Sequence, residues 1–156
     1  MWYTHGVGWT TAARPFAEPH YDIRRATAPD LVNWTRDEAA TIPHLPKRGE
    51  SGHTRPSVLR SGSAYEMWYC TRGFYADPDP AARNYRIGYA RSGDGARFQR
   101  ADGEFGFANP PKPGDWDAEM QSHPHVVRGD DGKVYMFYTG NGYGRVSLGY
   151  ATRVSG

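Results

Sequence analysis

Cysteine is almost absent from this chain of 156 residues. The one cysteine, Cys70, has no second cysteine with which to form an internal disulfide, and it sits in a stretch that is expected to be a buried strand. A small fold held together by disulfides is therefore excluded, and Cys70 is expected to be a buried thiol.

Charge of one sign is also scarce. The net charge is +2 at neutral pH, and the acidic and basic residues are spread along the chain. A protein that binds nucleic acid or an anionic membrane concentrates positive charge on one face, so neither partner is expected. No stretch has the length and hydropathy of a membrane span, and the first residues lack the segments of a signal peptide. These absences predict a cytoplasmic protein.

Helical periodicity is missing as well. Nineteen glycines and twelve prolines interrupt the chain too often for long helices. Residues 65–70 and 134–138 are instead apolar at nearly every position, a pattern typical of strands that are buried on both faces. The chain is therefore predicted to be all-β, with most of its aromatic residues in the core.

A pair of short segments occurs three times in the sequence. The first segment has the pattern Met, aromatic, Tyr, and the second ends in Ala after four or five residues of strand character. The copies of the first segment are residues 1–6, 67–73 and 136–140, and those of the second are residues 21–26, 85–90 and 146–151. Strand pairs repeated at this period predict a β-propeller, in which four-stranded blades pack around an axis.

The chain is expected to be a single partial propeller domain over residues 1–156, with blade units at about 1–41, 53–104 and 119–156. This amounts to about two and a half blades, whereas a closed ring needs roughly four to eight. Either a homo-oligomer or a missing half in a longer protein is therefore expected to complete the ring. A purely structural role, in which chains join into a ring of six short blades, is a further alternative.

An acidic residue four positions before an aromatic residue follows the first two strand pairs. Asp30 precedes Trp34 in this way, and Asp94 precedes Phe98. The aspartate is expected to cap a tight turn through its side chain, Gly95 to take a positive φ, and the aromatic residue to anchor an outer strand to the blade.

Several of these motifs together resemble a known family. The segments are residues 28–34 (Ala-Pro-Asp-Leu-Val-Asn-Trp), 55–58 (Arg-Pro-Ser-Val), 66–69 (Glu-Met-Trp-Tyr), 87–90 (Ile-Gly-Tyr-Ala) and 116–120 (Trp-Asp-Ala-Glu-Met). They are similar to the five-bladed propellers of glycoside hydrolase families 43 and 32, in particular to the carboxyl-terminal half of family 43-like proteins. Sialidases are an alternative that residues 92–95 fit only in part.

The resemblance implies a funnel at the ring axis where carboxyl groups meet a sugar. Glycoside cleavage usually needs two such groups, one protonated and one ionised. The sequence departs from the family pattern at both positions, because Arg55 and Ser122 stand where relatives have Asp and Glu. Glu119 is the remaining candidate for the catalytic acid, and partial burial of its carboxyl would raise its pKa. The second carboxylate stays unassigned, since the direction of Asp117 is unknown.

Other polar and aromatic residues are candidates for sugar contacts. His5, Arg72 and Asn141 occupy matching places after the first repeated strand, and Arg55 can grip a carboxylate or hydroxyl groups or form a salt bridge with Glu119. The predicted substrate-binding residues are His5, Trp9, Arg55, Arg72, His123, His125, Asn141, Tyr143 and Arg145.

Two alternatives to sugar contact are weaker. His123 and His125 share a face of a strand and can hold zinc with Glu119 or His5, but the lack of a cysteine cluster disfavours a metal. The glycines of residues 140–144 lack the helix and Lys-Ser/Thr of a phosphate loop. No metal or cofactor is therefore expected. The sequence predicts a glycoside hydrolase-like protein that acts on or binds a carbohydrate or glycoconjugate, or else a non-catalytic sugar-binding or assembly module.

Overall fold

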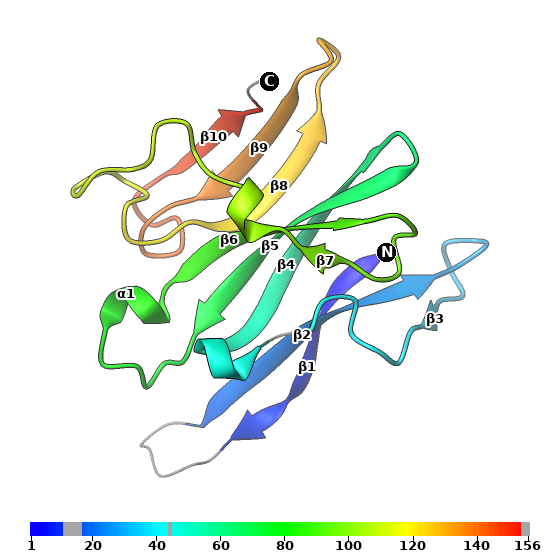
Figure 1. Cartoon of the computed structure of the whole chain (residues 1–156), viewed down its shortest axis with the longest axis horizontal. Helices are drawn as coiled ribbons and strands as arrows, with labels where there is room; N and C mark the ends of the chain where they lie inside the picture. Colours follow the sequence, from blue (N-terminus) through cyan, green and yellow to red (C-terminus); the bar gives the residue numbers. More distant parts are fainter. Residues whose placement is uncertain (11–16, 44, 154–156) are drawn as a thin grey trace.

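The computed structural model of the chain describes residues 1–10, 17–43 and 45–153. These residues form strands joined by turns and three very short helices, which confirms the prediction of a chain that is mostly β (Figure 1). The strands are β1 (Trp2–Thr10), β2 (Glu18–Thr27), β3 (Thr35–Arg36), β4 (Glu50–Ser61), β5 (Ala64–Gly73), β6 (Tyr85–Ser92), β7 (Gln99–Arg100), β8 (Ser122–Arg128), β9 (Val134–Thr139) and β10 (Leu148–Thr152). The helices are the 3-10 turns η1 (Pro46–Arg48) and η2 (Asp102–Glu104) and the single α-helical turn α1 (Pro80–Arg83).

The strands form three antiparallel units in chain order. Unit 1 contains β1 to β3, unit 2 contains β4 to β7, and unit 3 contains β8 to β10. Units 1 and 2 are connected through one parallel pair, Tyr21 with Gly52. A Cβ atom at Gly52 would lie 2.7 Å from the backbone nitrogen of Tyr21, so the close approach of the two units requires glycine at this position.

The sequence repeat is reproduced in the strand register. In each unit the second residue of the Met-aromatic-Tyr pattern pairs with the same position of the following strand. The three pairs are Trp2 with Arg25, Trp68 with Tyr89, and Phe137 with Tyr150. Each unit is therefore built on the same hairpin, as the repeated letters predict.

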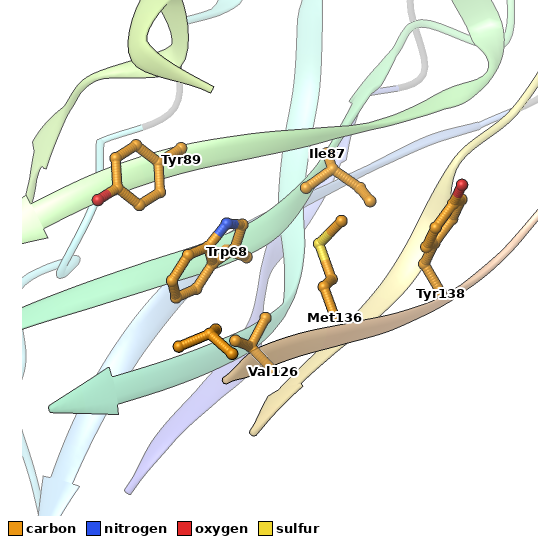
Figure 2. Close-up of a cluster of buried hydrophobic side chains, with 7 residues drawn as sticks. Trp68, Ile87, Tyr89, Val126, Met136 and Tyr138 are labelled. Atoms are coloured by element: carbon orange, nitrogen blue, oxygen red, sulfur yellow. The ribbon is translucent and has the colours of Figure 1, made fainter. Parts of the chain in front are cut away.

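The core consists of two apolar clusters, one on each face of unit 2. Met67 and Tyr69 of β5 pack against Ile23 of unit 1. Trp68, the residue between them, points to the opposite face of the sheet. It packs against Val126 and Met136 of unit 3 in the second cluster (Figure 2). Alternate residues of β5 are thus buried on opposite faces, which confirms that this strand is covered on both sides.

The acidic turns have the predicted structure. Asp30 Oδ1 accepts hydrogen bonds from the backbone N–H groups of Val32 and Asn33. In the same way, Asp94 Oδ1 accepts from the backbone N–H groups of Ala96 and Arg97. Gly95 has a φ of 71°, as expected. Phe98 is 4% exposed and anchors β7 as predicted, whereas Trp34 is 37% exposed and its indole N–H donates to the carbonyl of Leu31 in its own turn, so the predicted anchoring of β3 is not found.

Candidate functional site

Several polar side chains gather where β5 and β9 end and β6 and β8 begin. Antiparallel pairing brings these four strand ends to one end of units 2 and 3. We call Arg55, Arg72, Tyr85, His123 and Tyr143 the strand-end site. Four of these residues are predicted contacts, and Tyr85 is the addition that the structure makes.

Arg55 and His123 occupy matching places on the first strands of units 2 and 3. Each precedes a proline, each lies in a β-bulge, and each has a left-handed backbone, with φ of 53° and 55°. A left-handed conformation costs about 1–3 kcal/mol for a residue with a Cβ atom and persists only where the surroundings hold it, most often at functional sites. The same strained conformation therefore occurs twice at this end of the molecule, on the first strands of units 2 and 3.

Hydrogen bonds fix both strained residues. The backbone N–H of Arg55 donates to Thr4 Oγ1 at 3.0 Å. The backbone N–H of His123 donates to Cys70 Sγ at 3.1 Å, which gives the buried thiol a structural role. Burial raises the pKa of Cys70 to about 11, so it is a thiol and not a thiolate at neutral pH.

The imidazole of His123 is oriented by its neighbours. Its Nδ1 lies 3.0 Å from Ser122 Oγ and 3.0 Å from Thr139 Oγ1, and its ring lies 6.3 Å from that of Tyr85. Burial lowers the pKa of His123, and the positive charge of Arg55 lowers it further. The ring is therefore neutral at pH 7, and Nε2 makes no hydrogen bond to the described part of the chain.

Arg72 lies deeper than the sequence suggests. It is 2% exposed, its NH2 forms an ion pair with Glu18 at 3.0 Å and donates to the carbonyl of Pro19, and its guanidinium lies 3.8 Å from the centre of the Tyr75 ring. The prediction of an exposed loop contact at Arg72 does not fit this burial, because Tyr75 covers the side chain. Its Nε and NH1 have no hydrogen-bond partner in the described residues.

Two tyrosines form the aromatic part of the site. Tyr85 pairs with Arg72 across β5 and β6, and its ring packs edge to face with Tyr143 at 5.9 Å. Tyr143 is 55% exposed and has a φ of 61°. Burial raises the pKa of both phenols, so both hydroxyl groups keep their protons at neutral pH and can donate hydrogen bonds.

The loop that carries Glu119 borders the site. Asn141 Oδ1 accepts hydrogen bonds from the backbone N–H groups of Glu119 and Met120, and its Nδ2 donates to the carbonyl of Asp115. The Glu119 carbonyl accepts from Asn84 and Arg86. The backbone at Glu119 is thus held on both sides while the residue itself is exposed, so the partial burial expected for its carboxyl is not found.

Asp117 and Asn141 have structural partners. Asp117 is 5% exposed, and its Oδ2 accepts a hydrogen bond from the Tyr138 hydroxyl at 2.7 Å. Both ends of the Asn141 amide bond the loop backbone. These two polar groups therefore shape the loop, and none of the ion pairs among the described residues joins Arg55 to Glu119.

The remaining predicted contacts lie elsewhere. His5 is hydrogen-bonded to Asp22 on β2 at 3.0 Å, and Asp22 is also paired with Arg24. Trp9 is 68% exposed near the end of β1. His125 is exposed opposite Phe137 on β9, and Arg145 is exposed in the turn after β9. None of the hydrogen bonds, ion pairs or ring contacts among the described residues joins these four residues to His123.

Within the described residues no three His, Cys, Asp or Glu side chains are grouped so as to hold a metal ion, and no described helix has the length and hydropathy to cross a membrane.

Sequence reasoning overlooked Tyr85, although the repeat contains the signal for it. Once the strand pairing aligns Met67 with Ala90, the same register sets Tyr85 opposite Arg72. A residue opposite a predicted contact on a neighbouring strand is itself a candidate.

Comparison with known proteins places the fold. No family model matches the chain. Two uncharacterised proteins from two strains of Mycobacterium tuberculosis are each 33% identical to it over 153 residues, covering 97% of this chain and 45% of the relative. The chain therefore spans less than half the length of the curated relatives it matches.

Solved structures resemble the chain over nearly its whole length. A protein described as a glycoside hydrolase matches with a TM-score of 0.60 and 20% identity, covering 99% of this chain and 41% of the other. A structure described as an RGII complex gives a TM-score of 0.61 at 20% identity, over 99% and 40%. A family 32 β-fructofuranosidase of Bombyx mori gives 0.61 at 18% identity, over 97% and 30%. Over the part of their length that it covers, the chain has the β-fold of these glycoside hydrolase structures, as the resemblance of its motifs predicts.

Proposed function

We propose that this protein binds a carbohydrate at the strand-end site. The observation that carries the proposal is the pair of left-handed residues, Arg55 and His123, at matching places on the first strands of units 2 and 3. Strain that the fold maintains twice at one end of the molecule needs a reason, and ligand contact supplies it.

The groups available at this site suit a saccharide. Arg55 offers a planar fork of donors for a carboxylate or for neighbouring hydroxyl groups. His123 offers Nε2 of a neutral ring, which accepts or donates according to its tautomer. Tyr143 presents an exposed aromatic face and a hydroxyl group, the combination that ligand sites use against partly apolar molecules.

Similar structures support the class of ligand. Structures with this fold include the RGII complex, and a mutant of the Bombyx mori β-fructofuranosidase is in complex with sucrose. These ligands belong to those proteins, and for the present chain they support only the choice of carbohydrates as the first molecules to test.

The test is a glycan array of neutral and acidic oligosaccharides, followed by calorimetry with the best binder. Arg55→Ala is expected to weaken binding by at least about tenfold, because a charge-assisted hydrogen bond contributes about 1.5–3 kcal/mol. Arg36→Ala removes an exposed arginine from β3 and is the charge-matched control. Equal affinity in the two variants contradicts the proposed site.

Hydrolysis is the second candidate function, and the anchored loop favours it. Hydrogen bonds to its backbone hold Glu119 in place in the loop beside the strand-end site, and the residue is exposed. A protonated Glu119 would donate its proton to the glycosidic oxygen as the bond to the anomeric carbon breaks, and an ionised carboxylate would activate water or attack that carbon. The longer relatives have additional chain from which this second carboxylate can come.

Glu119→Gln tests this candidate on a panel of aryl glycosides and released glycans. Turnover is expected to be lost while sugar binding stays within about twofold, because the amide keeps the shape but cannot supply the proton. Glu38→Gln, at an exposed glutamate elsewhere, is the matched control. Unchanged turnover in Glu119→Gln would rule out Glu119 as the acid, and binding without turnover in the native chain would leave the binding function alone.

A further inference from the structure

The arginines of the strand-end site are not matched by acids of the site. Arg55 and Arg72 belong to it, and none of its members is an Asp or Glu. The carboxylate of Glu18 is engaged, because it pairs with Arg72 at 3.0 Å and accepts a hydrogen bond from the backbone N–H of Tyr75 at 2.9 Å. Glu119 borders the site, but none of the ion pairs among the described residues joins it to either arginine.

Arg55 combines a fixed backbone with an exposed guanidinium that has no partner. Its backbone is held by the bulge in β4 and by the hydrogen bond to Thr4. Within residues 1–10, 17–43 and 45–153, its guanidinium makes no ion pair and no hydrogen bond. Ion pairs engage instead the side chains of Arg24, Arg25, Arg72, Arg91, Arg100 and Arg153. The N–H donors of Arg55 are thus available to a ligand, in a planar fork that fits an anionic group.

Arg72 supplies a second positive charge from below the surface. It is 2% exposed, and its Nε and NH1 have no hydrogen-bond partner in the described residues. Tyr75 covers its guanidinium at 3.8 Å. A buried charge with incomplete hydrogen bonding is costly. An anion bound nearby offsets this cost, because charges below the surface are screened less than exposed ones.

The pKa shifts in the site agree with this distribution of charge. Burial lowers the pKa of His123, and the charge of Arg55 lowers it further. Burial and the Tyr75 phenol raise the pKa of Tyr143, and the charge of Arg72 opposes that rise. No carboxylate of the described residues contributes to either shift. The two ring-bearing ends of the site therefore both lie in the field of an arginine.

We propose that the saccharide bound at the strand-end site is anionic, and that Arg55 holds its carboxylate, sulfate or phosphate group through the fork of N–H donors. This inference rests on the proposed function and names the class of its ligand. The neutral His123 and the Tyr143 hydroxyl then contact the uncharged hydroxyl groups of the sugar, and the exposed Tyr143 ring contacts its apolar face.

The experiment compares ligands that differ only in charge, by calorimetry with the native chain. Trigalacturonic acid is expected to bind at least about tenfold more tightly than its methyl ester, because the ester retains the sugar rings but removes the negative charges. Galactotriose carrying one sulfate or one phosphate group shows which anion is preferred, and plain galactotriose is the neutral reference. The preference for the acid should shrink as the salt concentration rises from about 0.05 to about 0.5 M.

Variants then locate the charge recognition. Arg55→Gln should bring the affinities for acid and ester to within about twofold of each other, since it removes the charge-assisted hydrogen bonds. Arg36→Gln, at an exposed arginine of β3, should keep the native preference, and the Tm of both variants checks that they are folded.

The outcomes separate this inference from the proposed function. Equal binding of charged and uncharged trisaccharides by the native chain overturns the inference and leaves carbohydrate binding in place. The inference is also overturned if the preference for the charged ligand survives in Arg55→Gln, or if it does not change with salt. Absence of binding to every oligosaccharide of the array and of this series overturns the proposed function and the inference together.

Discussion

The two interfaces of unit 2 contain several equivalent residues and differ in how they are closed. Met67 and Tyr69 on one side correspond to Met136 and Tyr138 on the other, yet Phe98 closes the first interface and a cavity remains in the second. The difference separates the contribution of the paired strands from that of the turn that follows them. The hairpins fix the register, and the aromatic residue after the acidic turn fills the space between neighbouring units.

Phe98→Ala should have the largest effect, because it makes the filled interface resemble the open one. Removing a buried phenylalanine costs about 3–5 kcal/mol of the free energy of unfolding, measured by urea denaturation. Phe137→Ala, at a residue that is 39% exposed on β9, is the control and should cost far less. Similar losses in both variants would show that Phe98 does not close the interface.

The two equivalent tryptophans should respond differently to the same change. Trp2→Phe removes the donor to the Gly95 carbonyl and should cost about 1–2 kcal/mol beyond the smaller ring. Trp68→Phe removes an N–H without an acceptor in the described residues and should cost less. The comparison of the two unfolding free energies is the measurement, and an equal loss would contradict the asymmetry.

Protonation of the aspartates in the two acidic turns should have the smallest effect on stability. Here units 1 and 2 should respond in the same way. Backbone hydrogen bonds from Asn33 and Val32 lower the pKa of Asp30 to about 2, and those from Ala96 and Arg97 lower the pKa of Asp94. A lowered folded-state pKa means that the contribution of each turn is complete above the ordinary value of 3.8. For Asp30 it is lost as the pH falls from there toward 2, and for Asp94 it is lost as the pH falls below the ordinary value. NMR titration of the two side-chain carboxyl carbons tests this, and a midpoint near 3.8 for either would show that its turn is not formed as described.

The sequence was a good guide to the strands and their register. The three copies of the Met-aromatic-Tyr pattern each pair with the predicted second strand, because a period of two residues and a buried face allow only one register. The acidic turns were equally predictable, since an aspartate side chain that caps a turn acts on residues two and three positions away.

The site was less predictable because its geometry depends on long-range contacts. A residue before proline favours extended backbone, so the local sequence does not predict left-handed conformations at Arg55 and His123. These conformations depend on hydrogen bonds to Thr4 and Cys70, which are distant in sequence. The burial of Arg72 depends on Tyr75, which lies in the connection after β5.

The loop before β8 shows the same limit. The repeat does not include this loop. The spacing of the motifs therefore could not predict that the Asn141 side chain accepts hydrogen bonds from the backbone at Glu119 and Met120.

The central claim is that a saccharide binds where Arg55 and His123 meet and not in the cavity between units 2 and 3. The direct measurement is an NMR titration of the native chain with the best oligosaccharide from the array, following backbone amides and the His123 ring. We predict that the largest shifts fall on Arg55, Tyr85 and His123. Shifts confined to Trp68 and Met136, or saturation without any change at His123, would contradict the claim.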